Sequence, residues 1–435
     1  MNSTKAYKFR VYPDTKRKSE IDLQFILSKE FYNLLLEKSM KLYKDGNKKL
    51  SMAVLNGFAK EIEKEKKYLQ VYSQTRCEIK YRILKAYSNF FRRCEERKHG
   101  KKVKVGFPRF KSRDRYYSII YPQDNGSFSI RRERNVTMLR VSRIGRMKIE
   151  LHRKIEGKIK TLTVKKEAGQ YYAIFTTAKS IEPPIIKDTN PVGMDMGLNS
   201  FIAMSDGTKK KKPEFARKKE KKLAHWQGII ARKDIVAKKQ GRGKYTRNRA
   251  KVITHLQEAW READNQSNDF MHKLSDKLVN SGYTSFAVEK LDINSMVKNH
   301  RLARSIYNAS WNRFIQMLSY KAESAGLRVI QVDPRDTTQE CSSCHSIKQG
   351  EERLALNERI YHCNFCGLII DRDINASINI LKRAREGHSR SNASGDVASA
   401  IRQGLQAASM NQEHTLQQIV AREARTVYGW EDVTL

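Results

Sequence analysis

The chain has 435 residues, of which 39% are hydrophobic, and its 86 lysines and arginines outnumber its 47 acidic residues, giving a formal net charge of +39. A single hydrophobic core rarely grows beyond about 250–300 residues, so this length predicts two or three domains. Basic residues spread along most of the chain favour nucleic acid as the partner. An anionic membrane surface is the alternative, but no apolar run approaches the ~18 residues of a spanning helix.

The amino terminus and the cysteines bear on the cellular compartment. Residues 1–16 lack the apolar stretch of a signal peptide. Four of the six cysteines form CxxC pairs, which favours metal-bound thiolates in a reducing compartment over a disulfide framework. Cys77 and Cys94 lie outside the pairs and are interpreted as ordinary helix residues. We therefore expect a cytoplasmic protein.

The amino-terminal part of the chain combines strands and helices. Residues 6–11 alternate in polarity and predict a strand, whereas residues 16–98 contain no proline and show apolar residues at helical spacing. The basic faces of these helices favour phosphate-backbone binding over a neutral solvated surface. Residues 118–180 form short alternating runs that predict an antiparallel barrel or sandwich. The strand at 6–11 can pair into it, so the helices would be an insertion in the barrel.

The linker at residues 99–117 interleaves aromatic side chains with cations. Between residues 101 and 115 it has seven basic residues and one acidic residue. Such a segment could neutralise phosphates and stack on bases or ribose. It could equally be a solvated basic loop whose aromatic rings enter a neighbouring core. The aromatic residues are Phe107, Phe110, Tyr116 and Tyr117.

The carboxy-terminal part predicts strands that alternate with helices. After a stiff linker at 181–185, an apolar run carrying Asp195 precedes a hairpin, and residues 213–280 predict long basic helices. A strand ending in Glu289, a helix at 309–325 and a further strand follow. Burying a lone acid is costly, so Asp195 is expected at a strand end, exposed to a metal or to water, with a turn residue as the alternative.

A cysteine cluster follows these elements. Two CxxC pairs are separated by eighteen residues, a spacing typical of four-thiolate zinc ribbons. We predict one structural zinc ion, with an iron–sulfur centre or free thiols as alternatives. His345 and His362 flank the pairs and are interpreted as non-ligands. A closed site leaves no open coordination position, so this metal is not the catalyst. The predicted ligands are Cys341, Cys344, Cys363 and Cys366.

Three acidic residues are the candidates for catalysis. Asp195 on the first strand, Glu289 at a later strand end and Asp373 at a helix start suit an RNase H-like α/β fold, in which such carboxylates converge. Carboxylate oxygens suit Mg²⁺, and two ions about 3.5–4 Å apart can support phosphodiester hydrolysis.

Three segments of the carboxy-terminal part carry a resemblance: GMDMGLNSFIAMSDG, FAVEKLD and CSSC…YHCNFCGLIIDRDINASINI. They are similar to the three RuvC motifs and embedded zinc ribbon of the TnpB family, the RNA-guided nucleases of insertion sequences that are related to type V CRISPR effectors. YKFRVYP, GFPRFK and the basic helices after Asp206 also resemble it, so the likeness extends to about residue 390.

The resemblance implies a multidomain α/β architecture: a RuvC-like (RNase H-like) nuclease domain with an inserted zinc ribbon, and an amino-terminal wedge β-barrel that carries a helical recognition domain. The implied domains are the first wedge strand at 1–15, the recognition domain at 16–104, the rest of the wedge at 105–185, the nuclease domain at 186–336, the target-binding ribbon at 337–369, the last nuclease motif at 370–388 and a flexible tail at 389–435.

The resemblance also implies roles for residues and partners. Asp195, Glu289 and Asp373 would hold two Mg²⁺ ions, with Asp373 preferred over Asp371 because Asp373-Ile-Asn375-Ala376 matches the family's D-x-N-A pattern. Asp371 is the alternative ligand, and it would otherwise cap the helix. The implied partners are a guide RNA, with one protein per RNA, and double-stranded DNA in a prokaryotic cytoplasm at the nucleoid. A miniature type V CRISPR effector and a nuclease-inactive regulator are the alternatives.

Overall fold

The computed structural model describes residues 2–46, 50–112, 116–122, 126–180, 188–211, 213, 215, 220–241, 246–296, 299, 309–355 and 357–391. The predicted linker at 181–185 lies outside these residues, as does the predicted tail, except for residues 389–391. Within them, no helix is long and apolar enough to cross a membrane. The chain forms two compact units. The first contains residues 1–185, 213–273 and 324–326, and the second contains residues 186–212, 274–323 and 327–435.

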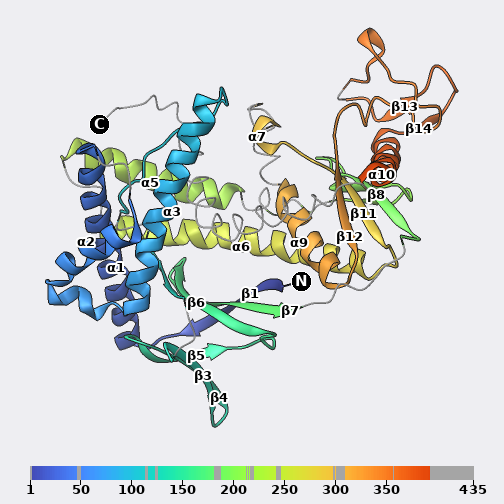
Figure 1. Ribbon diagram of the computed structural model, residues 1–435. Coiled ribbons are helices and arrows are strands. Elements are labelled where there is room, and N and C mark those ends of the chain that lie inside the picture. The colour runs from blue at the N-terminus through green and yellow to red at the C-terminus, as the bar shows by residue number, and fades with distance from the viewer. Residues whose placement is uncertain are drawn as a thin grey trace. The chain divides into compact units, whose positions relative to one another are not determined.

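A curled antiparallel sheet of seven strands forms the centre of the first unit, in the order β2-β6-β7-β1-β5-β4-β3 (Figure 1). The amino-terminal strand pairs with both β7 and β5, which confirms that it joins the later strands. Alternate side chains of the strands fill one core, as the period of two requires. The strands are β1 (Asn2–Tyr12), β2 (Ser118–Tyr121), β3 (Phe128–Glu133), β4 (Val136–Val141), β5 (Gly145–Glu150), β6 (Lys158–Glu167) and β7 (Gln170–Ser180).

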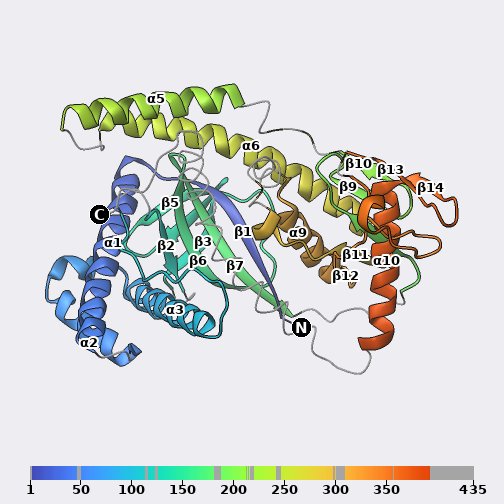
Figure 2. The same cartoon turned by 90° about the horizontal axis from the view of Figure 1, so that it is seen from above.

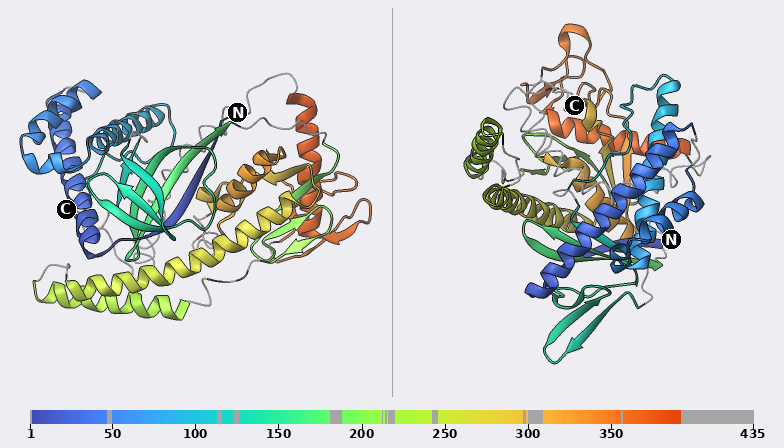
Figure 3. Two further views of the ribbon diagram at one scale, coloured as in Figure 1. Left: turned by 90° about the horizontal axis from the view of Figure 1, so that it is seen from below. Right: turned by 90° about the vertical axis from the view of Figure 1, so that its left-hand side faces the viewer.

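The predicted helical module lies between β1 and β2, beside the sheet in Figure 3. Its first helix begins where the Asp14 carboxylate accepts a 2.7 Å hydrogen bond from the Arg17 backbone N–H. The linker aromatic Phe107 packs on Phe90, with ring centroids 4.8 Å apart, and Tyr116 is buried, whereas Phe110 remains 52% exposed. The elements are α1 (Thr15–Lys44), α2 (Met52–Glu63), the 3₁₀ helix η1 (Lys66–Gln70) and α3 (Ser73–Lys98).

Two long basic helices run side by side, as Figure 2 shows: α5 (Glu220–Lys239) and α6 (Arg247–Val279). Leu223, Leu256 and Trp226 form a small core between them. Residues 213–273 belong to the first compact unit, whereas the sequence places them inside a nuclease domain at 186–336. The domain boundaries drawn from the sequence stay predictions.

The second unit contains a five-stranded sheet in the order β10-β9-β8-β11-β12. Strands β8, β11 and β12 are parallel, and β9 pairs antiparallel to β8. The central strands are buried along nearly their whole length, as expected for a parallel sheet covered on both faces. The elements are β8 (Pro191–Asp195), β9 (Ile202–Met204), β10 (Lys209–Lys210), β11 (Ser285–Glu289), α7 (Ile293–Met296), α9 (Trp311–Ser324) and β12 (Arg328–Val332).

After β12 comes the segment that contains the four cysteines, with the 3₁₀ helix η3 (Gly350–Glu352), β13 (Ile360–His362) and β14 (Ile369–Asp371). It leads into α10 (Arg372–Ser391). Helix α10 crosses β8 at Gly193. A β-carbon at that position would lie 2.0 Å from the Ser377 carbonyl oxygen and 2.9 Å from the Leu381 backbone nitrogen. Glycine is therefore required there because the two backbones approach too closely for any side chain.

We expect Gly193→Ala to destabilise the second unit by more than the ~1–3 kcal/mol typical of an overpacked core, because the clash is with backbone. The matched control is Gly228→Ala in α5, where a β-carbon meets nothing within 4 Å. Alanine in a helix interior stabilises by about 0.5–1 kcal/mol relative to glycine. Denaturant unfolding of both variants tests this, and an unfolding midpoint of Gly193→Ala equal to that of the parent would contradict it.

Candidate metal centre and acidic cluster

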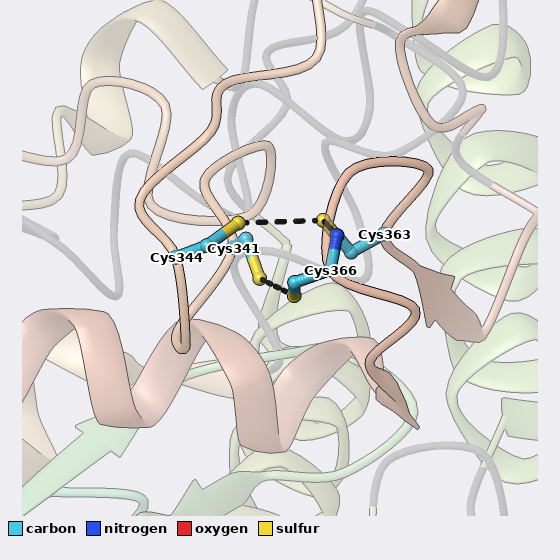
Figure 4. Close-up of side chains that lie close together, drawn as sticks. All are labelled: Cys341, Cys344, Cys363 and Cys366. Carbon is cyan, nitrogen blue, oxygen red and sulfur yellow. Dashed lines mark hydrogen bonds between the residues drawn. The ribbon is translucent and has the colours of Figure 1, made fainter.

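The four predicted cysteines converge, as Figure 4 shows, with their sulfur atoms all within 4.8 Å of one another. The Sγ atoms of Cys341 and Cys366 are 3.6 Å apart, as are those of Cys344 and Cys363. Four sulfurs bound tetrahedrally at about 2.3 Å from zinc would lie about 3.8 Å from one another. The geometry is therefore compatible with a structural zinc ion.

Each CxxC pair forms a tight turn, or knuckle, and the two knuckles share a backbone conformation. In each, the residue after the second cysteine adopts a left-handed conformation, His345 at φ 64° and Gly367 at φ 75°. The Ser346 hydroxyl lies 3.2 Å from the Cys344 sulfur and 3.3 Å from the Cys363 sulfur. This contact lowers the pKa of Cys363 to about 5, which favours the thiolate form that binds zinc. The His345 ring instead lies 3.0 Å from the Glu340 carboxylate.

Replacing Cys341 and Cys344 together by serine should remove one equivalent of bound zinc, because the remaining pair cannot complete the tetrahedron. The same double change at Cys77 and Cys94, which lie outside the cluster in α3, should leave the zinc content unchanged. Metal analysis of the purified proteins measures both, and unchanged zinc in the Cys341/Cys344 variant would exclude the assigned ligands.

The three predicted acids come from three elements that meet in the second unit. Asp195 ends β8 and Glu289 ends the parallel strand β11, where Val288 pairs with Met194. Asp373 lies in the first turn of α10, which packs on both strands. Among the described residues, only the cysteines form a group with every ligand atom within 4.8 Å, so the carboxylates are more widely spaced.

The carboxyl group of Asp195 is the most perturbed of the three. It lies at a strand end, as predicted, but the residue is only 8% exposed because α10 and neighbouring strands cover it. Burial, followed by the negative charges of Glu289 and Asp373, raises its pKa to about 8. Burial also raises the pKa of Glu289, against the opposing effects of the Thr337 hydroxyl and Arg383. Like charges thus accumulate in a poorly solvated place.

Asp371 caps α10. Its Oδ1 accepts hydrogen bonds from the backbone N–H groups of Asp373 at 2.9 Å and Ile374 at 3.2 Å. Burial alone would raise its pKa, but the Lys209 ammonium, 2.5 Å away, and these N–H groups lower the pKa below its ordinary value. The expectation that Asp371 forms a helix cap agrees with this geometry.

Two further residues of this cluster were not predicted from the sequence. Lys209 lies 3.7 Å from Asp373 Oδ2, and Thr337 donates a hydrogen bond to Glu289. The position of Lys209 follows from the register of the predicted hairpin. Lys209 and Asp195 both pair with Ala203 and so lie in one row across three strands. No comparable local signal marks Thr337, which comes 48 residues after Glu289.

Asp195 should make stability depend on pH when magnesium is absent. Its pKa is about 8 in the folded chain against an ordinary 3.8, so between these values the folded protein keeps a proton that the unfolded chain loses. The contribution to stability therefore falls as pH rises from about 4 to about 8. We expect Asp195→Asn, which cannot ionise, to raise the melting temperature by several degrees, since about 1 kcal/mol shifts it by ~2–4 °C.

Melting curves in magnesium-free buffer across this pH range measure the effect. The gain over the parent should grow from about pH 5 to about pH 8, because over this range the folded parent keeps a proton that the unfolded chain has already lost. A gain independent of pH would show that the change of side chain, rather than the removed charge, is responsible.

These features define a class: a protein with a four-cysteine cluster compatible with structural zinc, whose partly parallel α/β sheet carries an acidic cluster at its strand ends. Two family models match the chain. One described as "Probable transposase" matches residues 174–300, and one described as "Cas12f1-like, TNB domain" matches residues 311–380.

Curated relatives agree with these matches. A putative RNA-guided DNA endonuclease of Streptomyces pristinaespiralis is 28% identical over 388 residues, which cover 87% of this chain and 88% of the relative. A TnpB-like protein of Acanthamoeba polyphaga mimivirus is 28% identical over 51% of this chain and 43% of its own length. A putative transposase of Methanocaldococcus jannaschii is 35% identical over 83 residues, which cover 18% of this chain and 75% of the relative.

A solved structure supports the fold. The cryo-EM structure of a Cas12f1 complex with guide RNA and target DNA aligns with a TM-score of 0.53 at 13% identity, covering 87% of this chain and 98% of Cas12f1. The chain belongs to the TnpB family.

Proposed function

We propose that this protein is an RNA-guided DNA endonuclease that cleaves double-stranded DNA by metal-dependent phosphodiester hydrolysis at a single RuvC-like site. The observation that carries the proposal is the convergence of Asp195, Glu289 and Asp373 from two parallel strands and a helix start. Membership of a family whose curated members include putative RNA-guided DNA endonucleases supports it.

The donor set suits magnesium. Three carboxylates offer oxygen ligands of the kind that Mg²⁺ prefers, and their mutual repulsion, visible in the raised pKa of Asp195, would be relieved by a cation. Two such ions, held by Asp195, Glu289 and Asp373, would supply an activated water and neutralise the leaving oxygen. The chain's own part is to hold the carboxylates on rigid elements, with Lys209 and Arg372 placing positive charge beside Asp373.

The other parts have roles that follow from charge and family. Base pairing with a transposon-derived guide RNA supplies sequence specificity, and the protein reads duplex shape and a short motif beside the target. The curled sheet acts as the wedge that holds the RNA, the helices of residues 16–104 cover the guide–target duplex, and the ribbon at 337–369 contacts target nucleic acid. One protein binds one RNA, at the nucleoid of a prokaryotic cytoplasm.

The proposal is tested by copurifying the protein with its RNA and supplying a plasmid with a matched target and Mg²⁺. Asp195→Ala and Asp373→Ala should each slow cleavage by about 10³-fold or more, as for groups essential to the chemical step. The control is Asp269→Ala in α6, an exposed acid paired only with Lys273 among the described residues, which should cleave like the parent.

Asp371 provides the sharper comparison. Asp371→Asn keeps a side-chain acceptor for the helix cap and should retain cleavage, since asparagine caps helices as well as aspartate does. Cleavage by Asp195→Ala at the parent's rate would refute the catalytic assignment. Loss of cleavage in Asp371→Asn with normal cleavage in Asp373→Ala would move the metal ligand to Asp371.

Binding without cleavage by the parent under any divalent metal would favour the regulator, and an adjacent repeat array rather than transposon ends would favour a CRISPR effector.

A further inference from the structure

The segment that leads from β12 into the zinc ribbon also contacts the acidic cluster. Thr337, at the start of this segment, is 1% exposed, and its hydroxyl donates a hydrogen bond to Glu289 Oε1. Only four residues later the chain reaches Cys341 of the first knuckle. A residue bonded to the acids and a zinc ligand therefore share one short stretch of backbone.

Helix α10 holds this stretch from the other side. Asn379 is 1% exposed, and its side-chain amide donates to the Thr337 carbonyl at 3.0 Å and to the Glu340 carbonyl at 2.7 Å. One turn earlier, the fully buried Asn375 donates to the same Glu340 carbonyl at 2.7 Å. Spaced by four residues, the two asparagines lie on one helix face.

Asn375 also contacts the first knuckle directly. The Asn375 side-chain oxygen accepts a 2.9 Å hydrogen bond from the backbone N–H of Ser342, which lies between the two cysteines of the first knuckle. Amides suit this role because each offers both a donor and an acceptor to a backbone outside regular structure. The knuckle and Thr337 are thus held by the helix that carries Asp373.

We propose that Thr337 is a positioning residue that orients the Glu289 carboxylate, and that Asn379 keeps Thr337 in place. The inference rests on the proposed function, because it takes Glu289 as a metal ligand. The Thr337 hydroxyl donates to Oε1, and no hydrogen bond to Oε2 is found within the described residues, which leaves Oε2 as the oxygen for the metal. Hydrogen-bond partners of metal-binding carboxylates typically contribute 10–100-fold to metal affinity or activity.

The test compares Thr337→Val, which keeps the shape and loses the hydroxyl, with Thr337→Ser, which keeps the hydroxyl. Calorimetric titration of the full-length, zinc-loaded protein with Mn²⁺ should show affinity at least about 10-fold weaker in Thr337→Val and close to that of the parent in Thr337→Ser. The Mg²⁺ concentration for half-maximal cleavage should rise in the same order. Thr338→Val is the matched control, since no hydrogen bond of the Thr338 side chain is found within the described residues, and it should match the parent.

Two results overturn the inference. One is Mn²⁺ affinity in Thr337→Val equal to that of the parent, and the other is failure of Thr337→Ser to restore it. Zinc content and melting temperature, measured on the same samples, separate positioning from unfolding of the ribbon. A double-mutant cycle combines Thr337→Val with Asn379→Ala. Additive losses of Mn²⁺ affinity would show that Asn379 does not act through Thr337, whereas a sub-additive loss supports that it does.

The two proposals fail separately. If Glu289→Gln binds Mn²⁺ and cleaves as the parent does, Glu289 is not a ligand and the proposed site is wrong. If Glu289→Gln loses both while Thr337→Val keeps both, the site holds and only the positioning role is wrong.

Discussion

The close approach of α10 to β8 at Gly193 is the constraint on which the second unit depends. On the strand, Gly193 and Asp195 are two residues apart and so share one face, and on the helix, Ser377 and Asp373 are four residues apart and share one face. The contact between Gly193 and Ser377 therefore carries Asp373 towards Asp195. The same backbone crossing fixes both the packing of α10 and the approach of the two carboxyl groups, and a β-carbon at residue 193 would disturb both.

Bringing the acids together costs stability. Burial and like charges hold the pKa of Asp195 near 8, so the arrangement disfavours the ionised form that a metal site needs. The opposing contributions lie elsewhere in the same unit. Ala287, Val332, Ile380 and Ala384 form an apolar core between α10 and the parallel strands, and Lys209 and Arg372 place positive charge beside Asp373. Under the proposed function, a bound cation would relieve the remaining repulsion among the carboxylates.

The features that the sequence predicted well are those with a short repeat or a short spacing. The CxxC pairs, the alternating runs of the curled sheet and the apolar strand that ends in Asp195 are all local patterns, and the structure places them as expected. The features it left open depend on distant contacts. The packing of Phe107 into the helical core, rather than against solvent, is decided by α1 and α3.

Thr337 illustrates the limit more sharply. Nothing in the neighbouring residues distinguishes it from Thr338, and only the fold brings its hydroxyl to Glu289. Residue type alone does not separate Asp371 from Asp373, because both are aspartates at the same helix start, and only the family's D-x-N-A pattern favours Asp373. The structure adds that the Asp371 carboxylate turns back to the N–H groups of α10, which is the cap expected of it.

The place of the zinc ribbon in the chain now has a physical reason. The ribbon connects β12 to α10. A flexible connection of that length would restrain the helix start only weakly relative to the strand ends. Zinc bound to the four cysteines would remove the remaining freedom, because it would fold the two knuckles and the first knuckle is hydrogen-bonded to Asn375. Under the proposed function, a zinc ion that takes no part in the reaction would therefore still contribute to catalysis, by holding the carboxylate of α10 in register with those of the sheet.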